Sequence, residues 1–348
     1  MSGPRELLQQ LLEHRDLTQA QAESLLVQLA DPQTPPALAG ALLVALSSKG
    51  VVAQELRGLA QAMRRLARRP DLPPQLRSID IVGTGGDSSG SLNISTGTAL
   101  LTAACGVPVV KHGNRSVSSR CGSADVLQAL GLEIPLDAAA AGACFEATRF
   151  TYLFAPHYHP ATAAVAPVRA ALGVRTVFNI LGPLVNPAQP PLHLVGAFSP
   201  EVARLMADTF AGLPIERTFV IHGAAGWDEP TPIGPFTVYD VRPGQVEVGV
   251  RSAADYGLRA CTAADLAGGD AAHNAGALRK VLCGEERGAH RDCLLLGTAL
   301  ALEIAGITAD PREGIARARA AIDEGAARRL LEALPGRHAR SRAAGADT

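Results

Sequence analysis

The feature that most constrains this 348-residue chain is a stretch in which two short apolar runs each lead into a polar loop. The first run, 79–82, enters a glycine turn at 83–87, and polar residues at 93–96 then begin a segment with helical spacing. The second run, 107–110, leads into the basic residues 111–115. Glycine lets backbone N–H groups approach phosphate oxygens, and a helix N-terminus adds partial positive charge. Two such loops in succession predict a ligand that carries more than one phosphate.

The composition is that of an ordinary globular protein. Hydrophobic residues make up 47% of the chain and charged residues 19%, and a net charge of −1 gives no support for binding nucleic acid or membranes through bulk charge. Aromatic residues are only 4%, which argues against a surface that stacks bases. No apolar window is long enough to span a membrane, and the N-terminal residues lack a signal-peptide core. The six cysteines contain no CxxC pair and are interpreted as reduced thiols, so we expect a cytoplasmic protein.

The first part of the chain is predicted to be all-helical. Apolar residues recur at helical spacing over 4–70, Thr18 is a suitable N-cap, and Pro35 and Pro36 suit the start of a third helix. The segment 69–74 is rich in proline and predicts a hinge after these helices.

From residue 79 onward, apolar runs and helical patterns alternate, which predicts a mostly parallel sheet flanked by helices. The expected strands are 79–82, 107–110, 150–154, 194–198, 217–222 and 236–241, and the expected helices include 95–105, 123–130, 138–147, 200–212 and a single helix at 310–334. Helical pattern on both sides of Gly173 suggests that 161–182 joins the N-terminal helices. We therefore expect an α/β protein with a small all-α domain, a large α/β domain and a disordered tail: 1–72 with 161–182, 73–160 with 183–335, and 336–348.

The second polar loop, 111–119, combines two cations, a histidine, an asparagine and three serines. The chain has only three lysines, and the position of Lys111 in this loop hints that a compact ammonium group is needed there. A solvated turn is the alternative. We favour a ligand site, because a buried strand at 107–110 would deliver the loop to the edge of the sheet where ligands bind in open α/β folds. Residues 122–125 have the pattern of a further helix start facing the same crevice.

Two adjacent carboxylates, Asp228 and Glu229, follow the expected strand 217–222 and a glycine-containing turn at 223–226. Mg²⁺ takes one or two protein carboxylates and completes its coordination with water and ligand phosphates. An isolated Asp-Glu pair is more often an exposed acidic turn. With two phosphate loops upstream, a magnesium site is the better interpretation.

No enzyme nucleophile is predicted. The chain has no GxSxG motif, and no Cys–His pair can be placed in space from the sequence. His157 and His159 lie two residues apart in an expected loop, which is a poor spacing for a metal site. We expect these histidines to be structural or to line the substrate site.

Taken together, these motifs resemble those of the anthranilate phosphoribosyltransferase family, enzymes of tryptophan synthesis. The resemblance covers 4–335 and rests on GTGGD at 83–87, NIST at 93–96, KHGNR at 111–115, SS at 118–119, GSAD at 122–125, HPA at 159–161, PVRAALGVRTVFNILGPLVNP at 167–187 and the Asp-Glu pair at 228–229. It implies a fold shared with class II nucleoside phosphorylases, a homodimer formed through the small domain, and no nucleic-acid or membrane partner. It also implies transfer of the phosphoribosyl group from 5-phosphoribosyl 1-pyrophosphate to the amine of anthranilate, with two Mg²⁺ ions per subunit as cofactor.

The resemblance implies a role for each matching residue. The phosphoribosyl donor would be bound by Gly83, Gly86, Asp87, Ser91, Asn93, Ile94, Ser95, Thr96, Lys111, His112, Gly113, Asn114, Arg115, Ser118, Ser119 and Ser123. Anthranilate would contact Gly83, Asn114 and Arg169, with Arg169 facing its carboxylate. Mg²⁺ would be positioned by Ser95, Asp228 and Glu229.

The chain departs from the family pattern at a few positions. Ser88 replaces the glycine that usually follows GTGGD, and Ser-Leu at 91–92 stands where Thr-Phe is usual. After the HPA motif, Thr-Ala-Ala at 162–164 replaces larger or basic residues that line the acceptor entrance. This second departure bears on acceptor preference and leaves the donor motifs intact.

Three alternatives stay open at this point. A phosphoribosyltransferase could act on another aromatic acceptor, for which the only hint is 162–164. A pyrimidine nucleoside phosphorylase of the same fold would lack both KHGNR and the Asp-Glu pair. A non-catalytic relative that binds nucleic acid would show a basic groove and altered phosphate loops, against which the net charge and the intact loops argue. A panel of acceptors assayed with one donor would separate these possibilities.

Overall fold

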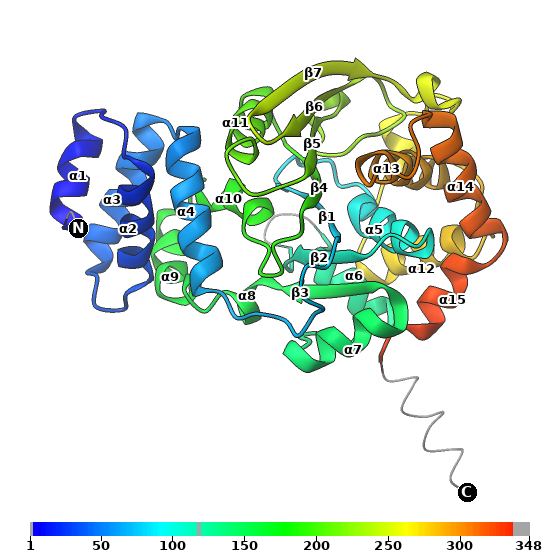
Figure 1. The fold of residues 1–348 in the computed structure, drawn as a ribbon, viewed down its shortest axis with the longest axis horizontal. Helices are drawn as coiled ribbons and strands as arrows, with labels where there is room; N and C mark the ends of the chain where they lie inside the picture. Colours follow the sequence, from blue (N-terminus) through cyan, green and yellow to red (C-terminus); the bar gives the residue numbers. More distant parts are fainter. Residues whose placement is uncertain (1–2, 117–119, 337–348) are drawn as a thin grey trace, which may run out of the picture.

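Seven strands form one sheet in the computed structural model, which describes residues 3–116 and 120–336. The strand order is β3-β2-β1-β4-β5-β6-β7 (Figure 1). Strands β1 to β5 pair in parallel, whereas β6 and β7 are antiparallel. The strands are β1 Ile79–Gly83, β2 Val109–Gly113, β3 Phe150–Phe154, β4 Leu192–Gly196, β5 Arg217–His222, β6 Phe236–Arg242 and β7 Gln245–Arg251. The predicted mostly parallel sheet is confirmed.

Helices flank the sheet and build a bundle at the N-terminus. The bundle contains α1 Pro4–Leu12, α2 Gln19–Ala30, α3 Pro36–Lys49 and α4 Ala53–Leu66. The later helices are α5 Ile94–Ala104, α6 Ser123–Leu130, α7 Ala138–Thr148, α8 Ala155–Tyr158, α9 Thr162–Leu172, α10 Phe178–Leu181, α11 Pro200–Phe210, α12 Ala271–Leu282, α13 Ala289–Ile304, α14 Pro311–Asp323 and α15 Ala326–Ala333. Short 3-10 turns are η1 Gly182–Leu184, η2 Ala224–Gly226, η3 Ala253–Tyr256 and η4 Ala263–Leu266. Thr18 accepts a hydrogen bond from the Gln21 N–H and Pro36 begins α3, which confirms both predicted helix starts.

Alternate side chains of the central strands enter two cores, one on each face of the sheet. In β4, Leu192 and Leu194 pack into the core shared with α5, α6 and α12 to α15, while Val195 packs into the core shared with α11 and the N-terminal bundle. Because both faces are covered, even the polar residues Asp80, Lys111 and His193 of the central strands are buried. Figure 1 shows the bundle at one end of the molecule and α14 and α15 at the other.

The helical segment within 161–182 lies against the N-terminal bundle. Helix α9 packs beside α2 and α3, and its Val165 belongs to the same buried core as the bundle leucines (Figure 1). The helix ends at Gly173, whose φ of 61° is left-handed and therefore suits glycine. The chain then returns through α10 to the sheet.

The second and fourth strands differ from their expected positions. β2 begins at Val109 and continues to Gly113, because Pro108 has no N–H group to donate to the ladder. Lys111 and His112 are therefore strand residues, and the prediction of a loop that begins at residue 111 is wrong. β4 begins at Leu192, two residues earlier than expected.

The C-terminal half holds two further differences. The single helix expected at 310–334 is two helices, α14 and α15, because Gly325 adopts a left-handed φ of 76° between them. Strand β7 was not predicted, although valines alternate at 246, 248 and 250; the structure leaves Val248 and Val250 exposed. Beyond Gly336, the expected tail lies outside the described residues.

Candidate active site

The sheet has a topological switch point between β1 and β4. Strands β2 and β3 extend the sheet from β1 on one side, and β5 extends it from β4 on the other. Open α/β sheets bind ligands at the carboxyl ends of strands beside such a point. β1 ends at Gly83 and β4 ends at Gly196, and these two residues are register partners. The glycine turn and the acidic pair both lie at this edge.

The acidic turn passes directly against the ends of these two strands. A Cβ on Gly83 would overlap the Asp228 carboxylate, and a Cβ on Gly196 would overlap the Asp228 main-chain oxygen. Asp228 Oδ2 also accepts a hydrogen bond of 2.6 Å from the Gly85 N–H. The glycine turn is therefore required for the close approach of a carboxylate, a role that phosphate binding alone does not explain.

Three carboxylates gather at this point. Asp87 Oδ2 accepts a long hydrogen bond of 3.4 Å from the Asp228 N–H, and Glu229 follows in the chain. Burial raises the pKa of Asp228, and the negative charge of Asp87 raises it further. Burial also raises the pKa of Glu229, with a second contribution from the charge of Asp228. Asp228 is only 7% exposed, so the alternative of an exposed acidic turn is wrong for this residue.

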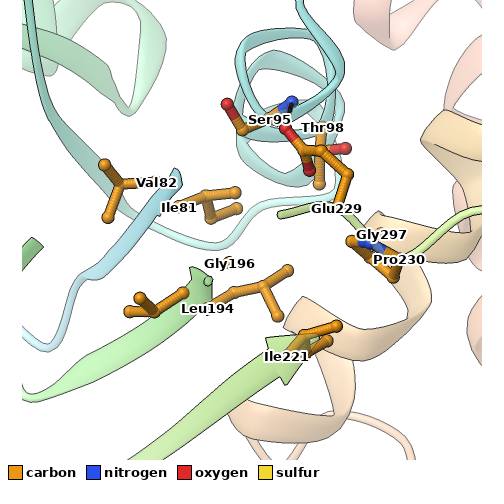
Figure 2. Close-up of a pocket in the computed structure, with 11 residues that line it drawn as sticks. Ile81, Val82, Ser95, Thr98, Leu194, Gly196, Ile221, Glu229, Pro230 and Gly297 are labelled. Carbon is orange, nitrogen blue, oxygen red and sulfur yellow. Dashed lines mark hydrogen bonds between the residues drawn. The ribbon is translucent and has the colours of Figure 1, made fainter. Parts of the chain in front are cut away.

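Glu229 reaches the beginning of α5. Its Oε1 accepts a hydrogen bond of 3.0 Å from the Ser95 N–H, and Figure 2 shows the carboxylate beside Ser95. The Ser95 N–H belongs to the first turn of the helix, where free N–H groups and the helix dipole favour an anion. The structure thus brings together two residues that the sequence placed in one metal site.

The donor set of this site fits Mg²⁺. Ser95 Oγ, Asp228 and Glu229 supply hard oxygen donors, and buried carboxylates of like charge favour a bound cation. Over residues 3–116 and 120–336, no group of three or more His, Cys, Asp or Glu side chains is arranged to hold a metal ion. Such a site suits an ion that takes few protein ligands and completes its coordination with water and phosphate oxygens.

Lys111 lies beneath the acidic pair and is buried. Its Nζ donates hydrogen bonds to the Ile81 main-chain oxygen and, at 3.4 Å, to Ser95 Oγ. Burial lowers the pKa of Lys111, while the negative charges of Asp80 and of 228–229 oppose this shift. The ammonium group therefore balances negative charge from within the sheet, which accounts for a compact lysine in an arginine-rich chain.

The next residue of β2, His112, makes its contacts elsewhere. Its Nδ1 lies 3.2 Å from the Gly182 main-chain oxygen, and its ring centre lies 5.0 Å from that of His159. Burial lowers the pKa of His112 to about 3 and that of His159 to about 4. Both histidines are therefore neutral near pH 7, and the His112 ring contacts the turn after α10.

Asp125 organises the described part of the loop that follows β2. Its carboxylate accepts hydrogen bonds from the Gly122 and Ser116 N–H groups. It also forms an ion pair of 2.6 Å with Arg115. Asn114 Oδ1 accepts a hydrogen bond of 2.7 Å from the Arg115 N–H. Arg115 is thus already paired with a carboxylate in this structure.

Ser123 begins α6, as predicted, and lies next to the end of β2. A Cβ on Gly113 would overlap Ser123 Oγ, and this hydroxyl lies 3.0 Å from the Tyr152 hydroxyl. Tyr152 is a neighbour of the site that sequence reasoning did not single out. Ser118 and Ser119 lie outside the described residues.

The residues around the start of α5 differ in what they can offer a ligand. Ser91 Oγ lies 3.2 Å from Ser89 Oγ, and Asn93 Nδ2 donates a hydrogen bond of 3.0 Å to the Cys121 main-chain oxygen. Ile94 and Thr96 are each 1% exposed, so their side chains belong to the core. These two residues can therefore contact a ligand only through main-chain atoms.

Arg169 lies on α9, and its guanidinium forms no ion pair with the described residues. Its Cζ lies 4.9 Å from the centre of the Phe178 ring, and burial lowers the pKa of this arginine. Among the described residues, no carboxylate lies within ion-pair distance of Arg169. A half-buried arginine with no carboxylate partner in the described part of the chain is suited to bind a carboxylate of a ligand.

Arg175 joins this helical segment to the glycine turn. Its Nη2 donates a hydrogen bond of 2.5 Å to the Gly86 main-chain oxygen, and its Cζ lies 4.4 Å from the centre of the Phe198 ring. Sequence reasoning included Arg175 in a motif but assigned it no role. The available signal was a second arginine six residues after Arg169.

A small cavity and a wider cleft lie at opposite ends of the central strands. A small cavity of about 10 Å³ lies beneath the contact between Ser95 and Glu229, and most of its lining is apolar (Figure 2). It has room for about one water molecule. A wider cleft of about 510 Å³ is lined by residues of 69–78 and 187–191 together with Glu216. That cleft lies at the amino ends of β1 and β4, away from the acidic pair.

Comparisons with known proteins agree along nearly the whole chain. The family model "Glycosyl transferase family, helical bundle domain" matches 5–67, and "Glycosyl transferase family, a/b domain" matches 75–328. The chain is 45% identical to the anthranilate phosphoribosyltransferase of Desulforudis audaxviator, with 95% of each chain covered. It is 44% identical to that of Rubrobacter xylanophilus, with 94% of this chain and 95% of the relative covered.

Solved structures give the same result. The crystal structure of anthranilate phosphoribosyltransferase from Thermus thermophilus matches with a TM-score of 0.88 at 40% identity, covering 94% of this chain and 97% of that one. The Saccharomyces cerevisiae enzyme in complex with PRPP and Mg matches with a TM-score of 0.87 at 28% identity, covering 95% and 96%. The expected fold, a small helical bundle beside a larger α/β unit, is confirmed by these matches.

Proposed function

The chain belongs to the anthranilate phosphoribosyltransferase family, and from this premise we propose how its residues divide the work of the reaction. The enzyme transfers the phosphoribosyl group of 5-phosphoribosyl 1-pyrophosphate to the amine of anthranilate. The products are N-(5-phosphoribosyl)anthranilate and pyrophosphate. One observation supports this assignment of residues. The acidic pair forms hydrogen bonds with both the glycine turn and the start of α5.

The donor is proposed to bind along the carboxyl edge of β1 and β2. The polyanion would be held by main-chain N–H groups, by the N-terminus of α5 and by polar side chains of the two loops. The proposed donor residues are Gly83, Gly86, Asp87, Ser91, Asn93, Ile94, Ser95, Thr96, Lys111, His112, Gly113, Asn114, Arg115, Ser118, Ser119 and Ser123. The buried position of Lys111 supports a role in balancing charge beneath the site.

Magnesium is the cofactor, and we propose that each subunit holds two ions through Ser95, Asp228 and Glu229. When bound, Mg²⁺ neutralises oxygens of the pyrophosphate and stabilises it as a leaving group. The chain supplies the negative charge that attracts the ion, and the Ser95 N–H fixes the orientation of the Glu229 carboxylate. The repulsion among the buried carboxylates supports the presence of a cation here.

The transfer is proposed to need no enzyme nucleophile. The bond between C1 of the ribose and the pyrophosphate oxygen breaks with the electron pair leaving on pyrophosphate, and C1 develops oxocarbenium character. The anthranilate nitrogen forms the new bond to C1 with its lone pair and then loses one proton to the departing pyrophosphate or to solvent. The residues of the crevice contribute mainly by orienting two substrates and by stabilising the departing charge.

Anthranilate is proposed to bind between the glycine turn and α9, against Gly83, Asn114 and Arg169. The lack of an ion pair between Arg169 and any described carboxylate supports contact with the anthranilate carboxylate, because an arginine fork matches a carboxylate through two parallel hydrogen bonds. Thr-Ala-Ala at 162–164 begins α9 on the same side, so these small residues are proposed to set the space at the acceptor entrance.

We also propose the domain division expected from the sequence, 1–72 with 161–182 and 73–160 with 183–335, and a homodimer formed through the first of these. The packing of α9 against the bundle supports the division. Exposed apolar side chains on α1, α2 and α3, namely Leu12, Val27 and Val44, support a partner surface on the bundle. In the described part of the chain, no helix has the length and apolar character needed to cross a bilayer. The free thiols of all six cysteines support a cytoplasmic location.

The acceptor panel is the test of this function. Pyrophosphate release is measured with one donor, Mg²⁺ and either anthranilate or other aminobenzoates, with and without excess EDTA. We expect anthranilate to be the best acceptor and EDTA to abolish turnover. Full activity in EDTA would contradict the metal assignment, and turnover of another acceptor without turnover of anthranilate would contradict the substrate.

A further inference from the structure

A partly buried relay of hydrogen bonds connects the C-terminal part of the chain to the start of α5. The Gly269 N–H donates to Asn274 Oδ1 at 2.7 Å, and Asn274 Nδ2 donates to Asn93 Oδ1 at 2.9 Å. Asn93 Nδ2 then donates to the Cys121 main-chain oxygen at 3.0 Å. Asn274 is 1% exposed, and no motif described above includes it.

The two ends of this relay fix the orientation of both amides. A main-chain N–H such as that of Gly269 can only donate, and a main-chain carbonyl such as that of Cys121 can only accept. Asn274 must therefore turn its oxygen to Gly269 and its nitrogen to Asn93. Asn93 in turn must present its oxygen to Asn274 and its nitrogen to Cys121. This arrangement satisfies the polar groups of the three hydrogen bonds just described, and unsatisfied buried polar groups are costly.

Main-chain hydrogen bonds also join the segment that precedes Asn274 to the residues before α5. The Leu92 N–H donates to the Leu266 oxygen at 3.1 Å, and the Gly268 N–H donates to the Gly90 oxygen at 2.8 Å. A Cβ on Gly268 would overlap the Ser91 main chain, so the two segments run in close contact. The segment that precedes Asn274 therefore packs against the residues before α5 and holds them in place.

We propose that Asn274 is a positioning residue for the phosphoribosyl donor, a role that rests on the proposed placement of Asn93 in the donor site. Asn274 holds the Asn93 amide in one orientation and, through it, fixes the distance between the N-terminus of α5 and the segment before α6. Both of these segments are proposed to contact the donor, so Asn274 affects donor binding without touching the donor.

The substitution Asn274→Asp isolates this role. The aspartate keeps an oxygen toward the Gly269 N–H but places its second oxygen against Asn93 Oδ1. If Asn93 rotates to donate to Asp, its oxygen faces the Cys121 oxygen, so one repulsive contact persists in either orientation. Lys280→Gln is the matched control, because it changes the charge of the same helix by the same amount at an exposed position.

We expect Asn274→Asp to raise the KM for the phosphoribosyl donor by about tenfold, the scale of one lost buried hydrogen bond. The KM for anthranilate and kcat should stay within about threefold, and Lys280→Gln should leave all three unchanged. When Asn93 is already alanine, adding Asn274→Asp should raise the donor KM by less than about a further twofold. The reason is that the Asn93 amide, through which Asn274 acts, has been removed. Asn274→Ser, whose hydroxyl is too short to reach Asn93, carries the same expectations if the aspartate variant does not fold.

Two results would overturn the proposal. One is a lower melting temperature with an unchanged donor KM, which would make Asn274 structural only. The other is an undiminished effect in the Asn93→Ala background, which would mean that Asn274 acts by another route. If Asn93→Ala alone leaves the donor KM unchanged, the placement of Asn93 in the donor site fails, and this failure is separate from a failure of Asn274 to act through Asn93.

Discussion

The guanidinium of Arg175 donates a hydrogen bond of 2.5 Å to the main-chain oxygen of Gly86. Gly86 lies in the turn proposed to hold the donor, and Arg175 lies six residues after Arg169 in the segment proposed to hold the acceptor. Phe198, on which the Arg175 side chain stacks, donates its N–H to Thr84 Oγ1 at 3.2 Å. The two proposed substrate sites therefore share a direct polar contact, and we expect the position of one segment to depend on the other.

Replacing Arg175 by alanine should weaken this dependence. We expect the donor KM to rise about fivefold, because the glycine turn loses a charged hydrogen bond, and the anthranilate KM to rise by a similar factor. Steady-state kinetics with each substrate varied in turn provides the measurement. Arg204→Ala, which removes an exposed arginine paired with Asp208 on α11, is the control. Unchanged KM values for both substrates would show that the contact has no part in binding.

Arg169→Ala should separate the two substrates. We expect the anthranilate KM to rise by at least about tenfold, because two charge-assisted hydrogen bonds to the anthranilate carboxylate are lost. The donor KM should stay within a few-fold of its original value. Arg169→Lys should recover only part of this loss, since an ammonium group cannot form two parallel hydrogen bonds. The structure shows no ion pair between Arg169 and a described carboxylate. The melting temperature of the Arg169→Ala variant should therefore differ little from that of the parent protein. An unchanged anthranilate KM would remove Arg169 from the acceptor site.

The double substitution of Asp228 by Asn and Glu229 by Gln should lower kcat by at least about 10²-fold, because the charge that attracts Mg²⁺ is lost. The free energy of unfolding, in contrast, should rise in the double variant. Folding raises the pKa of each carboxyl, so the charged carboxylates destabilise the folded state at pH values above their folded pKa. This destabilisation disappears as the pH falls to the pKa of the unfolded chain.

Thermal melting at pH 8 without Mg²⁺ tests this second expectation. The double variant should melt at or above the temperature of the parent protein. A melting temperature lower by tens of degrees would show that the acidic pair is structural.

His193 should make the protein sensitive to acid. This histidine is fully buried on β4, and burial lowers its pKa to about 3. The unfolded chain, with a pKa of about 6.5 for histidine, therefore binds one more proton between these values. The resulting contribution to stability is complete above about pH 6.5 and is lost as the pH falls, at up to about 1.4 kcal/mol per pH unit.

The variant His193→Asn tests this linkage, because the Asn oxygen can replace Nδ1 in the hydrogen bond with Thr218. Denaturant unfolding at pH 7, 6 and 5 should give a shallower loss of stability than in the parent protein, even if the variant is less stable at pH 7. His273→Asn, at an exposed position of α12, should leave the slope unchanged. Equal slopes for parent and His193→Asn would contradict a buried neutral histidine.

The sequence predicted elements whose signals are local. Strands 150–154 and 217–222 were found with their observed bounds, because each is an apolar run between clear turn residues. The start of β2 was misplaced because Pro108 interrupts an apolar run without ending it. Lys111 was assigned to a loop because a buried lysine in a strand gives no local signal before its long-range partners are known.

The acidic pair and the start of α5 were assigned to one site from motifs, and the structure brings Ser95 and Glu229 together. Asn274 and Arg175 escaped detection for a common reason. Their partners, Asn93 and Gly86, lie 181 and 89 residues away in the chain. A single hydrogen bond over such a separation leaves no periodicity or spacing in the sequence. Hydrogen bonds between residues so far apart in the chain can be identified only when the three-dimensional structure is known.

The absence of a side chain at Gly196 has a consequence for mutational tolerance. A methyl group at this position would meet the main chain of Asp228, so even alanine must push the acidic turn away from the ends of the strands. Gly196 holds no reactive atom, yet it is as restricted as Asp228, whose main chain it accommodates. In a library screened for activity, residue 196 should accept as few replacements as residue 228, and attempts to widen acceptor range are better directed at 162–164.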